Sequence, residues 1–243
     1  MIHLSNRAVL AISGADAREF LQGLTTNDVN LLAPEKALYA ATLSPQGKYL
    51  FDYFLYQDGD KILLDILASR ADELIKKFNM YKLRSDVQIE KTNLQVYAGV
   101  GVPDPRSSKL SRRFITAEPQ KTDGDLTDYK LHLLQHGVPD SDDFIIDKSF
   151  VMHYRFEELH GVSFSKGCYV GQENTARMKY KGTIRKSIYI VEGENLPAFG
   201  AEIEGLGTML SSQGNIGIAL CDIDAALSYK NLDITLPRFL ITV

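Results

Sequence analysis

The chain has few cysteines, no surplus of positive charge and no long apolar run, and each shortage excludes a class of protein. Of its 243 residues only Cys168 and Cys221 are cysteines, which excludes a framework of several disulfides. A permanently bound iron–sulfur cluster normally takes four thiolates, so this chain alone is not expected to hold one. The net charge of −4 provides no general attraction to nucleic acid, and we predict no DNA partner.

Membrane and familiar catalytic signatures are missing as well. No apolar run approaches the roughly 18 residues of a membrane-spanning helix, and the first residues lack the apolar core of a signal peptide. We therefore expect no membrane partner and a cytoplasmic protein, or a mitochondrial matrix protein in a eukaryote, although no transit peptide is seen. The chain has no CxxC, HExxH, Walker lysine or dinucleotide glycine motif. Its histidine pairs lack a third ligand at suitable spacing, so we predict no metal site.

The spacing of apolar residues predicts an α+β protein in two parts. Strands are expected over residues 7–13, 38–43, 49–56, 61–67, 87–90, 95–100 and 112–116. Helices are expected from residues 17 and 71 and over 128–135 and 150–159, whereas residues 103–125 predict a surface connection around one strand. Hairpins among the strands favour α+β over a doubly wound parallel sheet. After residue 182 only short β-rich runs remain, which predicts a small C-terminal β-barrel over residues 183–243. Residues 1–182 form the N-terminal region, which has a sub-part at about 36–95.

One stretch, residues 166–173 with the sequence KGCYVGQE, fits neither a helix nor a strand pattern. Its two glycines permit tight turns or close approach to a ligand. Cys168 is either a redox-active, metal-transferring or nucleophilic thiol activated by the nearby Lys166, or a small buried residue. Lys166 either binds an anion or is solvated, and Gln172 and Glu173 contact either a heterocycle or the loop backbone. Cys221 ends an apolar strand and is expected in the core.

Two further features carry candidate chemistry. Asp52 interrupts an apolar strand, where a carboxylate is costly unless it is paired. It is either a group that binds a ring nitrogen or transfers a proton, or an edge residue that faces water. Residues 177–186, RMKYKGTIRK, contain five cations and no acid, which indicates either a surface for phosphates or carboxylates or a solvated face at a domain junction.

Three motifs together resemble one known family. Residues 166–173, followed by Ala176-Arg177 and Lys181-Gly182, closely resemble the KGCYxGQE block of the YgfZ-type folate-binding proteins. Those proteins belong to the superfamily of the glycine-cleavage T protein, an aminomethyltransferase. The runs FLQGLTTNDV at residues 20–29 and SPQGK at 44–48, ahead of Asp52, resemble the same family. The spacing agrees over most of the chain.

This resemblance implies ferredoxin-like α+β parts and a C-terminal β-barrel around a central folate site. It implies a role in assembly or repair of iron–sulfur clusters, mainly those of [4Fe–4S] enzymes, with tetrahydrofolate or a derivative as cofactor and A-type carriers or client proteins as partners. It assigns Cys168 and Asp52 as catalytic residues. The residues it assigns to cofactor binding are Lys166, Tyr169, Gln172, Glu173, Arg177 and Asp52. Where the family often has a Pro-x-Glu that helps to hold the pterin, this chain has His153.

Three functions of different classes stay open. The first is a folate-dependent accessory factor for iron–sulfur clusters, which we expect to assist other proteins rather than turn over a substrate. The second is a tetrahydrofolate-dependent aminomethyltransferase, against which the cysteine block argues because T-protein chemistry needs no thiol. The third is a structural module that only binds partners.

Overall fold

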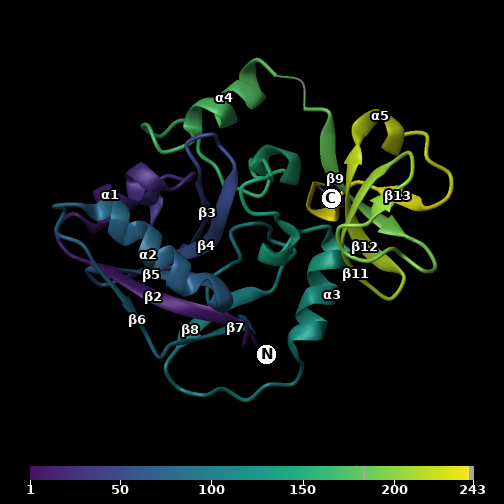
Figure 1. Cartoon of the computed structure of the whole chain (residues 1–243). Helices are drawn as coiled ribbons and strands as arrows, with labels where there is room; N and C mark the ends of the chain where they lie inside the picture. The colour runs from purple at the N-terminus through teal and green to yellow at the C-terminus, as the bar shows by residue number, and fades with distance from the viewer. Residues whose placement is uncertain (183, 241–243) are drawn as a thin grey trace.

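Antiparallel sheets form the framework of the molecule, a computed structural model that describes residues 1–182 and 184–240 (Figure 1). Every pairing between its named strands is antiparallel. The first sheet, in spatial order, contains β3 (Leu38–Leu43), β4 (Tyr49–Asp58), β5 (Lys61–Leu67), β2 (Arg7–Ser13) and β6 (Gln88–Lys91). A second, small sheet contains β1 (Ile2–His3), β7 (Gln95–Gly99) and β8 (Arg112–Thr116). The expected α+β class is confirmed.

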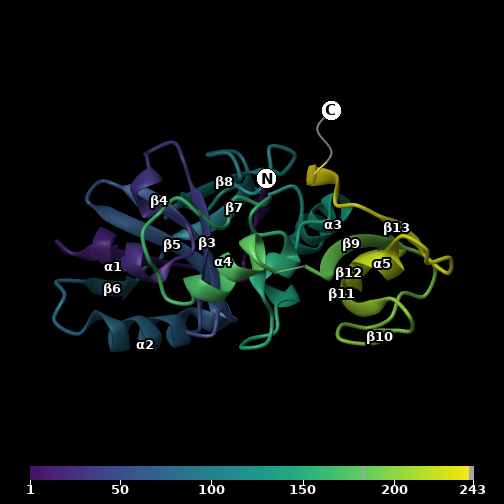
Figure 2. The ribbon, with the colours of Figure 1, turned by 90° about the horizontal axis from the view of Figure 1, so that it is seen from above.

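Two helices cover one face of the first sheet, as Figure 2 shows for α2. They are α1 (Ala17–Leu24) and α2 (Ala71–Lys82), and their apolar spacing brings Leu21 and Phe78 against Tyr53 and Leu55 of β4. The alternate residues of the same strand, Phe54 among them, point into the main core on the other face. Both faces of this sheet are therefore buried.

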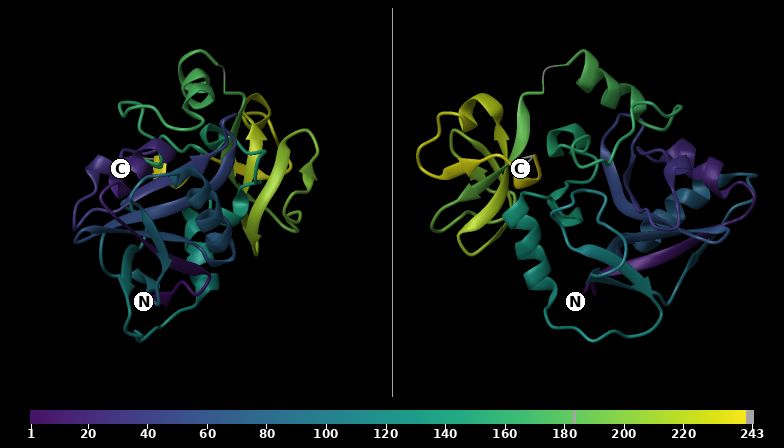
Figure 3. Two further views of the ribbon diagram at one scale, coloured as in Figure 1. Left: turned by 60° about the vertical axis from the view of Figure 1, so that its left-hand side comes forward. Right: turned by 180° about the vertical axis from the view of Figure 1, so that it is seen from behind.

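The C-terminal sheet lies on the side of the molecule away from the first sheet, as both the front and rear views show (Figures 1 and 3). In spatial order it contains β10 (Glu202–Ile203), β11 (Gly207–Gln213), β12 (Ile216–Asp222), β9 (Lys186–Glu192) and β13 (Asp233–Thr235). The helix α3 (Leu126–His136) lies against β11 and β12, and Gly137 ends it in the left-handed conformation with φ 71°. Asp143 accepts hydrogen bonds from the amide and hydroxyl of Ser211 at 2.8 and 2.6 Å, which joins this sheet to the middle of the chain.

A buried network of arginines and aspartates lies between the sheets. Asp65 accepts from Arg7 at 2.6 Å and from Arg113 at 2.5 Å, and Asp104 pairs with Arg106 at 2.9 Å. These five side chains are almost inaccessible to solvent. Loss of one partner from such a pair leaves an uncompensated charge and costs about 3–5 kcal/mol. The prediction of a surface connection at residues 103–125 is therefore wrong for Asp104 and Arg106, because both are buried as an ion pair.

The structure corrects several element boundaries. Residues 150–159 do not form a helix, because only the 3₁₀ turn Val151–Tyr154 is present and Arg155 follows with φ 56°. The block at residues 166–173, which fits no helix pattern, ends inside a helix, because α4 (Gln172–Tyr180) begins at Gln172 and takes in the first part of the basic run. The expectation that no helix follows residue 182 is wrong, since Asp222 caps the short α5 (Ile223–Ala226). The expected boundary between the two parts falls at Thr183, which lies outside the described residues.

Candidate functional site

Lys166 anchors the cysteine loop. Its Nζ donates to the carbonyl oxygens of Gln22 at 2.7 Å, Thr25 at 2.7 Å and Asn27 at 2.9 Å. The side chain is buried, and burial lowers the pKa of Lys166 to about 8, with the nearby Asp28 opposing that shift. Because the three protons of the ammonium group already have acceptors, Lys166 acts as a tether for the loop rather than as a receptor for an anion.

The two glycines at residues 47 and 171 allow two distant motifs to touch. A Cβ on Gly171 would lie 2.5 Å from the carbonyl oxygen of Ser44, and its φ of 85° favours glycine. A Cβ on Gly47 would lie 2.9 Å from the Cβ of Asn174. The side-chain amide of Asn174 donates to the carbonyl oxygen of Gln46 at 2.8 Å. The turn at residues 44–48 therefore packs directly against the start of α4. Together with the Lys166 contacts, this brings all three resemblance motifs to one place.

Cys168 is the accessible thiol of the chain. It is exposed and unpaired, whereas Cys221 is buried, as expected, and burial raises the pKa of the Cys221 thiol to about 12. Cys168 lies in a shallow surface groove of about 560 Å³ that also involves Tyr81 of α2 and, from the block itself, Gln172 and Glu173. With Tyr169, which also lines it, the structure thus brings four of the predicted site residues to one groove.

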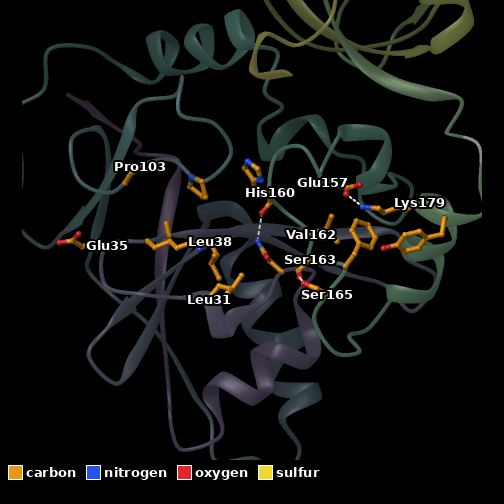
Figure 4. Close-up of a pocket in the computed structure, with 16 residues that line it drawn as sticks. Leu31, Glu35, Leu38, Pro103, Glu157, His160, Val162, Ser163, Ser165 and Lys179 are labelled. Atoms are coloured by element: carbon orange, nitrogen blue, oxygen red, sulfur yellow. Dashed lines mark hydrogen bonds and ion pairs between the residues drawn. The ribbon is translucent and has the colours of Figure 1, made fainter. Parts of the chain in front are cut away.

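A separate cavity of about 710 Å³ is lined in part by residues 162–165, the segment that leads into this loop (Figure 4). Its wall includes Phe164 and Tyr180, whose rings make an edge contact at 5.8 Å between centroids. Lys179 sits 4.2 Å from the Phe164 ring centre and forms an ion pair with Glu157. The remaining lining residues are Asn27, Leu31, Glu35, Lys36, Ala37, Leu38, Pro103, Pro105, His160, Val162, Ser163 and Ser165.

Asp52 lies apart from both the groove and the cavity. Only 3% of it is exposed, so it does not face water at a sheet edge. Its carboxylate accepts from the hydroxyls of Tyr49 at 2.6 Å, Tyr39 at 3.0 Å and Ser141 at 3.0 Å. Burial, followed by the charge of Asp52, raises the pKa of both tyrosines well above the usual range. A carboxylate held in this way has no open path to a ligand in this conformation.

The other residues assigned from sequence have different surroundings. Tyr169 lines the groove as well, but it is buried in the main core, where burial raises its pKa to about 12. Arg177 is exposed on α4 and lines neither the groove nor the cavity. His153 is half-buried beside Phe150 and lies outside the cavity wall. Burial, followed by the charges of Lys186 and Lys48, lowers the pKa of His153.

Sequence reasoning missed most of the residues that form the cavity, with the exception of Lys179 and Tyr180 in the basic run. Glu157 comes four residues after His153 and lines the cavity, and Arg155 between them breaks the expected helix. Phe164 and His160 both precede the block at residues 166–173. Their place just before it was the only signal in the sequence that they could belong to a site. The described residues contain no group of three or more side chains suited to a metal ion.

Comparison with solved structures defines the class of fold. The chain matches the glycine cleavage system aminomethyltransferase T from Bartonella henselae with a TM-score of 0.72, at 11% sequence identity. The match covers 97% of this chain and 84% of that one. The protein therefore has the fold of the aminomethyltransferase T proteins, as the resemblance implied.

Comparison with curated proteins defines the family. The chain is 31% identical over 271 residues to the mitochondrial iron–sulfur cluster assembly factor IBA57 of Mus musculus, covering 89% of this chain and 76% of the relative. It is 31% identical over 269 residues to the human protein of the same name, with the same coverage. A homolog from Neurospora crassa is 28% identical over 278 residues, covering 95% of this chain and 63% of the relative. The chain belongs to the IBA57 family of iron–sulfur cluster assembly factors. No family model matches it.

Proposed function

We propose that this protein supports the assembly or repair of iron–sulfur clusters, mainly those of [4Fe–4S] enzymes, and that Cys168 is its reactive group. The single observation that carries the proposal is an exposed thiol on a loop that a buried lysine fixes to the protein body. On binding iron as a thiolate, Cys168 loses its proton to solvent. One thiolate does not satisfy a cluster, so the other ligands come from a partner such as an A-type carrier or a client enzyme.

We further propose that tetrahydrofolate or a derivative occupies the cavity beside the loop. Its volume of about 710 Å³ suits a ligand of this size. Phe164 and Tyr180 would flank a flat ring, Glu157 would accept from N–H groups of the pterin, and Lys36 would attract the glutamate carboxylates. When bound, the folate supplies one-carbon chemistry. This proposal depends on the cavity alone, since Lys166, Asp52, Gln172, Glu173, Arg177 and Tyr169 do not line it.

Two measurements test the parts separately. Titration of the purified protein with tetrahydrofolate should give saturable binding. If no saturable binding is seen and the protein still restores a deletion strain, the proposal that it binds folate is wrong. Activity of a [4Fe–4S] enzyme in that strain tests the thiol, with Cys168→Ala compared with Cys221→Ala. Equal rescue by Cys168→Ala and the wild type would favour a purely structural, partner-binding module.

The second candidate function is a tetrahydrofolate-dependent aminomethyltransferase, which the shared fold favours. It needs a carboxylate that reaches the substrate, and Asp52 is enclosed by three hydroxyl donors. Folate-dependent release of formaldehyde equivalents from an aminomethyl donor would establish it. For the compartment we propose either cytoplasm or a mitochondrial matrix, since the relatives are named as mitochondrial and an exposed free thiol suits a reducing environment.

A further inference from the structure

A smaller cavity lies where α3 meets the C-terminal sheet, and we call it the junction cavity. Its volume is about 290 Å³, and Figure 1 shows α3 beside β11. One wall comes from α3 and the turn that follows it, and the other comes from β11 and from Phe199 ahead of β10. It shares no lining residue with the cavity of about 710 Å³ beside the cysteine loop, so the two are separate sites.

Apolar side chains form much of the wall of the junction cavity. They are Leu133, Leu134, Val138, Leu210 and Phe199. The first four are buried, whereas Phe199 is 53% exposed. An exposed ring at the edge of a cavity can contact a ligand held there, and the face of such a ring attracts cations. The wall therefore suits a small ligand with an apolar body.

Asp143 adds a buried carboxylate to this wall. It is 1% exposed, and no cation of the described residues lies within ion-pair distance of it. Its hydrogen-bond donors are neutral: the amide and hydroxyl of Ser211, and the amide of Asp140 at 2.8 Å. Because a carboxylate has about four acceptor positions, Asp143 has room for one further donor.

The other buried aspartates of the described residues are compensated within the protein. Asp65 and Asp104 pair with arginines, and Asp52 accepts from three hydroxyls. Asp143 differs from them because it lines the junction cavity and lacks a cation. Burial of a charge is costly unless the charge is paired. The junction cavity therefore favours a ligand that brings a positive charge to Asp143.

The remaining charged groups of the wall leave a negative balance. Asp142 pairs with Lys130 at 3.1 Å, so these two charges largely cancel. Asp140 is half-buried and has no ion pair among the described residues, which leaves it and Asp143 as two uncompensated carboxylates. The described side chains form no group suited to a metal ion. An organic cation, which is larger than a metal ion, fits carboxylates that are spread over a wall.

We propose that the junction cavity binds a small organic cation, a protonated amine with a short apolar chain. Its ammonium group donates to Asp143 and Asp140, and its chain lies against Leu133 and Leu134. The same ammonium chemistry is carried by a free amine and by a lysine side chain of another protein. Because such a ligand contacts both α3 and β11, its binding also stabilises the joint between the C-terminal sheet and the rest of the chain.

The test is an NMR titration of the full chain with n-pentylamine, followed at the amide of Ser211, which donates to Asp143. It is run above the pKa of Asp143, about 6, so that this carboxylate is charged. The dissociation constant should be at least about tenfold lower than that of 1-pentanol, which lacks the charge, because charge-assisted hydrogen bonds are the stronger ones. Equal affinity for the two compounds, or no change at the Ser211 amide, would overturn the proposal.

Variants assign the binding to the wall of the junction cavity. Asp143→Asn should abolish the preference for n-pentylamine over 1-pentanol. Phe199→Ala, at an exposed position that leaves the fold intact, should weaken amine binding about fivefold. Glu204→Gln is the control, since Glu204 is exposed on the same sheet and lies outside the cavity wall, and it should bind as the wild type does. Wild-type affinity in both Asp143→Asn and Phe199→Ala would show that the amine binds elsewhere.

A second probe identifies the source of the ammonium group. N-acetyl-lysine methylamide presents it as a lysine side chain of another protein does. Tighter binding of this probe supports a lysine of a partner as the occupant, and tighter binding of n-pentylamine supports a free amine. The result is independent of the proposed function, because the junction cavity and the folate cavity share no residue.

Discussion

The Nζ of Lys166 donates to the carbonyl oxygen of Thr25 at 2.7 Å, which ties the cysteine loop to the turn after α1 across 141 residues of chain. This bond is one of three that hold the ammonium group in a buried position. The loop that presents Cys168 is therefore part of the folded body, and its geometry depends on a residue whose own chemistry is structural.

Lys166→Met should destabilise the protein by about 2–4 kcal/mol, because it leaves three buried carbonyl oxygens without a donor. Urea unfolding followed by circular dichroism measures the change. Lys61→Met, at an exposed position, is the control and should stay within about 0.5 kcal/mol of the wild type. A stability equal to that of the control would show that Lys166 does not anchor the loop.

Gly171→Ala should lower stability by about 2 kcal/mol, since its Cβ would lie 2.5 Å from the Ser44 carbonyl oxygen and its φ is 85°. The corresponding fall in melting temperature is about 4–8 °C for a chain of this size. The matched control is Gly167→Ala in the same block, where an added Cβ meets no atom within 4 Å. Equal melting temperatures for the two variants would contradict the close contact between the motifs.

Asp143 gives stability a pH dependence that can be measured. Burial raises its pKa to about 6 from a usual value of 3.8, so between these values the folded state holds a proton that the unfolded state has lost. The contribution of Asp143 to the free energy of unfolding is therefore fully present below about pH 4. It is lost as the pH rises through about 6, and the total loss is about 3 kcal/mol. Asp143→Asn should remove this slope.

Urea unfolding at pH 4 to 7 measures the slope, with Asp142→Asn as control because that neighbour is half-exposed and pairs with Lys130 at the surface. An unchanged slope in Asp143→Asn would assign the pH dependence to another group.

Phe164→Ala should weaken tetrahydrofolate binding about tenfold, because the ring forms part of the aromatic wall of the cavity. Phe199→Ala removes an exposed ring from the C-terminal part and should leave binding unchanged. Fluorescence titration measures both. Equal affinities would mean that the ligand binds elsewhere.

The fold was predictable where a strand is a continuous apolar run. The strands at residues 38–43 and 61–67 follow the expected bounds, because their apolar runs are packed from both sides. The segment at residues 150–159 has equally apolar spacing but breaks at Arg155, whose left-handed backbone no periodicity encodes. The burial of Asp104 and Arg106 was not predictable either, because it depends on a mutual ion pair and on the Tyr129 hydroxyl far along the chain.

The exposed thiol of the candidate site was predictable, and the cavity was not. The composition of residues 166–173 marked a candidate site, and Cys168 is exposed there. The same composition could not show that Lys166 points inward to carbonyl oxygens supplied by residues 22–27. Nor could it show that Asp52 is enclosed by Tyr39 and Tyr49, since such contacts form only in the folded chain.

The most direct test of the account is the activity of a [4Fe–4S] enzyme in a strain that lacks its own copy of this protein and carries Cys168→Ala. The account predicts activity as low as in the uncomplemented strain, with wild-type levels of the variant protein and full activity with Cys221→Ala. Full activity with Cys168→Ala would contradict the central claim that this thiol is the reactive group.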